Sequence, residues 1–125
     1  MTGSLADREE GPEQLRQVAA IIAGWAQDEP LIARAYLFGS RAKGVDLPGS
    51  DLDVAIELDP GRLSANDETE GMTTWFAHKG LWQKVLKERT RQPVHLAWHH
   101  PEKTEAVHRG LVEAGYCIYR KGQRR

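Results

Sequence analysis

Asp51 and Asp53 are the residues whose types and spacing most directly suggest chemistry. They open residues 51–56, where alternating apolar residues are typical of a half-buried strand. Side chains alternate along a strand, so both carboxylates point to one face, about 6.6 Å apart along the chain. Two like charges side by side repel each other and require a compensating cation. The pair therefore predicts a site for a hard divalent ion such as Mg²⁺, which prefers carboxylate and phosphate oxygens.

A glycine and a serine precede these aspartates and suggest the second half of a site. Residues 35–38 form an apolar run short enough for a buried strand, Gly39 and Ser40 break it, and a short helix can start at Arg41 and include Lys43. Backbone N–H groups at a helix N-terminus, together with a serine hydroxyl, suit a phosphate. A phosphate cradle beside metal-binding carboxylates predicts a site for a nucleoside triphosphate with its Mg²⁺.

These two segments together resemble the signature of the nucleotidyltransferase superfamily, the DNA polymerase β-like group. That signature is an apolar residue, Gly, Gly or Ser, a spacer of about ten residues, and then Asp-apolar-Asp/Glu-apolar. Here it reads Phe38-Gly39-Ser40, the ten residues 41–50, and Asp51-Leu52-Asp53-Val54. Either half alone is a weak signal, whereas the joint pattern between two strands is specific. The competing interpretation is an acidic strand end beside a glycine turn, without a ligand.

The likeness extends to the small stand-alone members, the minimal nucleotidyltransferases, which include MntA-type antitoxins of HEPN/MNT systems. Residues 113–119, Glu-Ala-Gly-Tyr-Cys-Ile-Tyr, look like the closing segment of that group, so the resemblance covers the chain from about residue 33. It implies an α/β (α+β) chain with the polymerase β-like nucleotidyltransferase fold, a small mixed sheet with helices packed against it. It also implies Mg²⁺, or Mn²⁺ in its place, with ATP as the substrate.

The function implied by the resemblance is transfer of a nucleoside monophosphate, AMP from ATP, onto an acceptor hydroxyl. Gly39 and Ser40 would hold the terminal phosphates, and Arg41 or Lys43 would neutralise developing charge. Asp51 and Asp53 would place the metal ion for in-line attack. A HEPN-type toxin protein is the acceptor that the resemblance favours. The alternative is a catalytically degenerate domain that binds a partner protein as an antitoxin or senses nucleotide.

His95 occupies the position where the family carries its third acid, in the apolar-Asp-apolar pattern of the third strand. Imidazole is a poor ligand for Mg²⁺ and acceptable for Mn²⁺ or Zn²⁺. Three interpretations follow: His95 acts as a general base, it accepts a softer metal, or the site has lost transfer. The ordinary pKa of histidine, near 6.5, suits a general base. Glu57 shares the face of the aspartates but lies about 13 Å beyond Asp53, too far to replace the third acid.

The elements that must position these residues follow from periodicity, capping and turn residues. The expected helices cover residues 12–28, 72–89 and 102–114, and the expected strands cover 33–38, 51–58, 94–98 and 116–119. In the second helix, apolar residues from Met72 to Leu86, with Trp75, Phe76 and Trp82 among them, should pack on the sheet, and a platform for an adenine base is the alternative. His99 and His100 should be exposed loop residues just past the third strand, and His108 receives no role.

Length and composition set the wider limits. The chain has 125 residues, 40% of them hydrophobic, a formal net charge of −1 and one cysteine, Cys117. We expect a single domain over 12–120, a disordered N-terminus over 1–11 and a basic tail over 121–125. The near-balance of charge gives no case for nucleic-acid or membrane binding, and one cysteine excludes an internal disulfide. The lack of a long apolar run and of a signal pattern makes the cytoplasm the default location.

Overall fold

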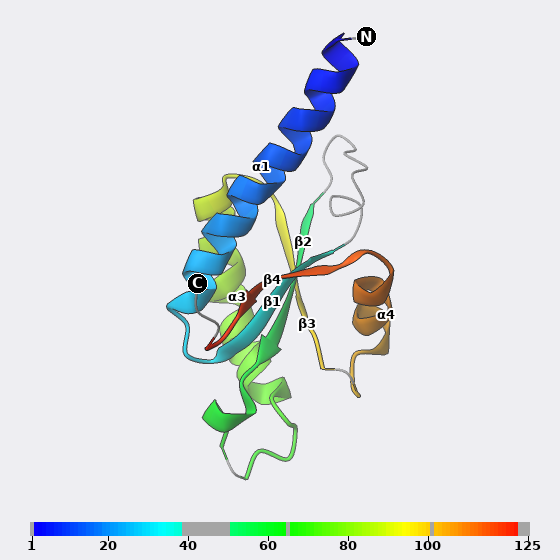
Figure 1. Ribbon diagram of the computed structural model, residues 1–125. Helices are drawn as coiled ribbons and strands as arrows, with labels where there is room; N and C mark the ends of the chain where they lie inside the picture. Colours follow the sequence, from blue (N-terminus) through cyan, green and yellow to red (C-terminus); the bar gives the residue numbers. More distant parts are fainter. Residues whose placement is uncertain (1, 39–50, 65, 101, 123–125) are drawn as a thin grey trace.

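A computed structural model of the chain describes the backbone of residues 2–38, 51–64, 66–100 and 102–122, and its side chains except over 2–14 and 113–114 (Figure 1). The helices and strands, in chain order, are α1 (Thr2–Gln27), β1 (Ile32–Phe38), β2 (Leu52–Leu58), the 3-10 helix η1 (Pro60–Arg62), α3 (Met72–Thr90), β3 (Val94–Trp98), α4 (Glu105–Ala114) and β4 (Tyr116–Arg120).

The four strands form one mixed sheet in the order β3-β2-β1-β4. β1 pairs antiparallel with both β2 and β4, whereas β2 and β3 are parallel neighbours. The β2–β3 connection passes through α3, because parallel neighbours need a crossover. Helices α1 and α3 cover one face of the sheet and α4 covers the other (Figure 1). This confirms the predicted fold class, a small mixed sheet with packed helices.

The predicted strands agree with the structure to within one residue at each end, and α3 agrees equally well. Helix α1 differs at its start, because it begins at Thr2 and not at Pro12. The helix continues through Gly11 and Pro12, although a proline inside a helix costs about 3 kcal/mol, so the backbone of 2–11, predicted to be disordered, is helical. Helix α4 begins at Glu105, three residues later than predicted. The division into domains stays a prediction.

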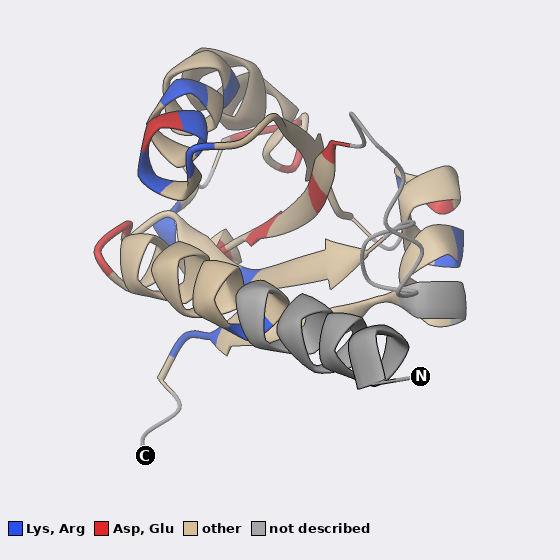
Figure 2. Cartoon of the chain, turned by 90° about the horizontal axis from the view of Figure 1, so that it is seen from above, with Lys and Arg blue, Asp and Glu red and all other residues tan. Residues whose placement is uncertain are grey.

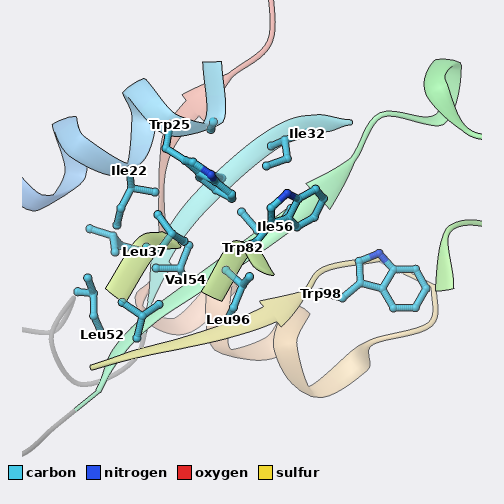
Figure 3. Close-up of a cluster of buried hydrophobic side chains, with 14 of the residues drawn as sticks. Ile22, Trp25, Ile32, Leu37, Leu52, Val54, Ile56, Trp82, Leu96 and Trp98 are labelled. Carbon is cyan, nitrogen blue, oxygen red and sulfur yellow. The ribbon is translucent and has the colours of Figure 1, made fainter. Parts of the chain in front are cut away.

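The core lies between the sheet and the helices α1 and α3 (Figure 3). Leu52, Val54 and Ile56 of β2 are fully buried there, which confirms that the alternate residues of this strand face inward. Trp82 is the largest fully buried side chain and meets Trp25 of α1 edge to face, with ring centroids 5.9 Å apart. This packing holds β2 in place and leaves its polar residues on the opposite face.

Helix α3 does not bury all the residues expected of it. Trp75 and Trp82 face the core, but Met72 and Phe76 are exposed. Phe76 directly follows Trp75, and successive residues of a helix lie about 100° apart, so the two rings cannot share one narrow buried stripe. The prediction that Phe76 packs on the sheet was therefore wrong.

Helix α4 ends at Gly115, as predicted. The amide of Gly115 donates to the carbonyl of Leu111, 2.8 Å away. A Cβ atom at Gly115 would lie 2.7 Å from the Cα atom of Leu111, so only glycine fits this close approach. Among the described residues, no helix is both long enough and apolar enough to cross a membrane.

Candidate active site

The parallel pairing of β2 and β3 places Asp53 directly beside His95. Nδ1 of His95 lies 3.3 Å from Oδ1 of Asp53, and both side chains project from the sheet face opposite the main core. The imidazole is 60% exposed and the carboxylate 26% exposed. The structure thus brings together two of the three predicted catalytic residues, which are 42 positions apart in the chain.

Asp51 immediately precedes β2 and is exposed. Burial raises the pKa of Asp53 above its ordinary value, the His95 imidazole opposes that shift, and the Asp51 carboxylate adds to it. The two aspartates therefore repel each other, and the His95 side chain only partly compensates them. A donor set of two carboxylates with this excess of negative charge fits a divalent cation.

The contact with Asp53 also sets the chemistry available to His95. An ionised carboxylate can only accept hydrogen bonds, so Nδ1–H of His95 is the donor in this pair. Nε2 then carries a lone pair on an exposed ring. In this orientation His95 can accept a proton or bind a metal ion through Nε2.

The predicted phosphate-binding residues Gly39, Ser40, Arg41 and Lys43 lie outside the described residues. β1 ends at Phe38, and Phe38 pairs with Asp53 across the antiparallel β1–β2 ladder. The last residue of β1 therefore lies beside Asp53. Their roles stay a prediction.

A second polar cluster, which was not predicted from the sequence, lies on the same sheet face. Oε2 of Glu57 lies 3.1 Å from Nδ1 of His99, and Oε1 accepts from Nη1 of Arg34 at 3.0 Å. Nε2 of His99 lies 3.2 Å from Nδ1 of His108 on α4, and the two rings stack with an interplanar angle of 5°. These contacts fasten α4 to the sheet.

His99 is only 5% exposed, so the prediction of an exposed loop histidine was wrong for this residue. Its backbone N–H donates to the carbonyl of Ile56 at 2.8 Å, which prolongs the β3 pairing by one residue. The register pairs Asp53 with His95 and Ala55 with Ala97, so Glu57 and His99 follow at the same spacing of two. That spacing was visible in the sequence once the strands were taken as parallel neighbours.

A pocket of about 410 Å³ lies at the other end of β2 from Asp51, with Glu57, Trp98 and His99 in its wall. Near it, ligand atoms of Glu70, His100 and Glu102 lie within 4.8 Å of one another and can share a metal ion. Two contacts within the protein compete with metal binding by these three side chains. Nζ of Lys103 lies 3.3 Å from Glu70, and Nδ1 of His100 accepts the backbone N–H of Glu102 at 3.2 Å.

The family profile described as nucleotidyltransferase domain matches residues 18–110, which include Asp51, Asp53 and His95. No curated protein matches the chain. The family match therefore covers most of the chain and includes the predicted catalytic residues.

Two solved structures are similar to this chain. One is a toxin–antitoxin with AMP-PNP, at 20% sequence identity and a TM-score of 0.60, over 84% of this chain and 75% of the other. The second is a mutant of the toxin–antitoxin MntA-HpeT, at 16% identity and a TM-score of 0.52, over 93% of this chain and 75% of the other. At such identities the likeness shows a shared fold.

Proposed function

The chain belongs to the nucleotidyltransferase domain family, and from this premise we propose that it transfers a nucleoside monophosphate from ATP to a hydroxyl group of a partner protein. The observation that carries the proposal is the pairing of Asp53 with His95 next to Asp51. These side chains offer two carboxylates for a metal ion and one imidazole for a proton. The AMP-PNP of the first similar structure, an adenine nucleotide, supports ATP as the donor.

The proposed roles follow from the chemistry of the side chains. Asp51 and Asp53 would hold Mg²⁺, which when bound would polarise the α-phosphate and neutralise the charge on its oxygens. Ser40 and the backbone of Gly39 would bind the terminal phosphates, and Arg41 or Lys43 would stabilise the leaving charge. The acceptor oxygen bonds to the α-phosphorus as the bond to the β-phosphate oxygen breaks, and pyrophosphate leaves with that electron pair.

His95 would take the proton of the acceptor hydroxyl on Nε2. Its Nδ1 is held 3.3 Å from Asp53, so the ring presents its other nitrogen away from the carboxylate. In this role the histidine would replace the third acid as the proton acceptor, and the two aspartates alone would bind the metal ion. Mn²⁺ is the alternative ion, because imidazole also serves as one of its ligands.

The proposed acceptor is a toxin protein of the HEPN type. Both similar structures are toxin–antitoxins, which supports a protein partner. The formal net charge of −1 gives no electrostatic support for a nucleic-acid acceptor. A hydroxyl on the toxin would then reach the metal site while the two proteins are bound.

A second candidate is a domain that binds its toxin and nucleotide without transfer. The observation that favours it is His95 itself, because two metal ions at a triphosphate need bridging oxygen ligands that imidazole cannot supply. The two candidates share the nucleotide site and differ in the chemical step. A His95→Asp variant separates them, since transfer seen only in that variant would identify the natural protein as a binder.

The first experiment is a calorimetric titration of ATP into the protein with Mg²⁺ and then with Mn²⁺, repeated with Asp51→Asn. We expect metal-dependent binding that Asp51→Asn weakens at least about 100-fold, because a metal ligand is lost. Glu105→Gln is the matched control, since it removes the same charge from an exposed position on α4. Equal binding by Asp51→Asn, or no binding with either metal, would exclude the proposed site.

The second experiment tests the transfer itself. The protein, ATP and Mg²⁺ are incubated with a candidate toxin, and intact mass spectrometry looks for the added mass of one nucleoside monophosphate on the toxin. We expect the product with the natural protein and not with Asp53→Asn. Binding of ATP without any product would favour the non-catalytic alternative.

A further inference from the structure

Helix α4 is joined to the sheet by three side chains, Glu57, His99 and His108, that the proposed function does not use. Oε2 of Glu57 lies 3.1 Å from Nδ1 of His99, and Nε2 of His99 lies 3.2 Å from Nδ1 of His108. The sheet, with the acidic residues of β2, lies between α4 on one side and α1 and α3 on the other (Figure 2). This hydrogen-bonded series therefore runs from the polar face of the sheet to the helix that covers it.

The Glu57 carboxylate decides which ring nitrogens of the series carry protons. Glu57 is paired with Arg34, whose Nη1 donates to Oε1 at 3.0 Å. An ionised carboxylate can only accept hydrogen bonds, so in the neutral ring of His99 the proton is on Nδ1 and a lone pair is on Nε2. That lone pair faces Nδ1 of His108, which must therefore be the donor. Nε2 of neutral His108 is left with a lone pair.

The two ends of the series differ in their access to solvent. His99 is buried, and its ring meets Tyr36 edge to face with centroids 5.6 Å apart. His108 lies on α4 and is exposed, and no described residue forms a hydrogen bond with its Nε2 atom. The facing nitrogens of the two imidazoles are closer together than the ring centroids, which are 5.4 Å apart. A buried carboxylate–imidazole pair is thus directed at an exposed imidazole.

This arrangement is suited to an activated nucleophile. A nucleophilic side chain is activated when an adjacent base can take its proton and a third group orients that base. Here His108 is in the place of the nucleophile, His99 in that of the base and Glu57 in that of the orienting group. When Nε2 of His108 bonds to an electrophile, the ring must release the proton on Nδ1. Nε2 of His99 lies 3.2 Å away to accept it.

The surroundings of His108 indicate which electrophile fits. Acyl transfer requires donors for an oxyanion, and the backbone N–H of His108 already donates to the carbonyl of Thr104 at 3.0 Å. A metal ion requires several ligands, and the three-ligand group found among the described residues, Glu70, His100 and Glu102, does not include His108. Phosphoryl transfer demands less, because its transition state is loose and the protein acts mainly by positioning the reactants.

We propose that Nε2 of His108 is a phosphoryl-acceptor site, which takes its phosphoryl group from a small activated phosphate such as a phosphoramidate. The bond from Nε2 to phosphorus forms as the bond from phosphorus to the leaving group breaks, and the leaving group, ammonia from phosphoramidate, departs with that electron pair. The proton on Nδ1 passes to Nε2 of His99. Glu57 lies about 13 Å beyond Asp53 along β2, so this site goes beyond the proposed function and does not depend on it.

The reaction with phosphoramidate tests the proposal directly. The folded protein is incubated with potassium phosphoramidate at pH 7.5, and peptide mapping under neutral conditions locates the phosphoryl group, because a nitrogen–phosphorus bond is labile in acid. We expect a phosphoryl group on His108 and its loss in His108→Gln. Modification of other residues without modification of His108 would overturn the proposal, and so would an unmodified protein.

Glu57→Gln and His99→Gln test the contribution of the hydrogen-bonded series. Glutamine at position 57 keeps the size of the side chain without its charge, and glutamine at position 99 can accept a hydrogen bond but cannot take up a proton. We expect each variant to phosphorylate His108 at least about tenfold more slowly. Glu105→Gln is the matched control, since it removes a charge about one turn before His108 on α4. Equal rates in all the variants would overturn the proposal.

The ring protonation can also be measured in the natural protein, so this test does not depend on the folding of any variant. Two-bond ¹H–¹⁵N NMR spectra distinguish protonated from unprotonated nitrogens in histidine rings. We expect both His99 and His108 to carry their proton on Nδ1 at pH 7.5. A proton on Nε2 of neutral His108 would overturn the proposal, because that nitrogen would then have no lone pair for phosphorus.

Discussion

The imidazole of His95 lies 3.3 Å from the carboxylate of Asp53 on the neighbouring parallel strand, Nδ1 to Oδ1. This contact gives the histidine a defined orientation and gives the aspartate a partial countercharge. Because of this contact, a substitution at either residue also removes a hydrogen-bond partner of the other.

Replacing His95 by glutamine should separate proton transfer from binding. Glutamine can still donate a hydrogen bond to Asp53, but it cannot take a proton from the acceptor hydroxyl. We expect transfer to fall by about 10²- to 10⁴-fold, with the affinity for ATP and Mg²⁺ changed less than threefold. Single-turnover kinetics and calorimetry measure the two quantities. Transfer at the natural rate would exclude His95 as the general base.

Asp53→Asn should stabilise the metal-free protein at neutral pH. Burial raises the pKa of Asp53 in the folded protein. Above that pKa, the ionised carboxylate is less favourable in the folded state than in the unfolded chain, and this lowers the free energy of unfolding. The penalty is fully present at pH 7 and disappears below the ordinary aspartate pKa of 3.8. We therefore expect a higher free energy of unfolding for Asp53→Asn at pH 7, and no difference near pH 3. A destabilised variant at pH 7 would contradict this account.

Stability should fall in mild acid because of His99. Burial lowers the pKa of His99 below its usual value of 6.5, and the Glu57 carboxylate acts in the opposite direction. His108 and His100, which also face this ring, lower the pKa further. The unfolded chain therefore binds a proton at this residue more readily than the folded chain does. The contribution of neutral His99 to the free energy of unfolding is complete above pH 6.5 and is lost as the pH falls below that value.

Urea denaturation at pH 7.5 and pH 5.5 measures this loss, and His99→Gln should reduce the difference between the two values. His78→Gln is the matched control, because His78 lies on α3 and leaves the contacts of Glu57, His99 and His108 intact. If His99→Gln kept the full pH dependence, another group would have to be responsible.

Trp82→Ala should destabilise the protein by about 3–5 kcal/mol, because this ring is 1% exposed and contacts both Trp25 and Trp75. Phe76→Ala on the same helix should cost about 0.5 kcal/mol or less, since its ring is exposed. Chemical denaturation of both variants measures the difference. Similar costs for the two would contradict the assignment of buried and exposed faces to α3.

Much of the fold could be predicted from local sequence. Alternation in residues 51–58 placed β2, because side-chain direction alternates strictly along a strand. Trp75 and Trp82 were correctly assigned to the core by their helical spacing. The stretch from Phe38 to Val54 indicated the family, because glycine, serine and paired aspartates at that spacing serve one kind of chemistry.

Other features depend on contacts between distant residues. Neither the start of α1 nor the exposure of Phe76 follows from periodicity, because the helix continues through Pro12, where a helix start was expected, and a helix can bury only one side of its surface. The burial of His99 depends on α4 returning over the sheet and bringing His108 against it. No local pattern contains that information.

The sequence by itself therefore determined the family, the strands and the residue types of the candidate site. Only the tertiary structure decided that His95 stands beside Asp53 and that Glu57 is joined to His99. The physical reason is the register of the parallel β2–β3 pair. A shift of one residue would turn His95 to the opposite face, and that register is held by the burial of Leu52, Val54 and Leu96 against α1 and α3.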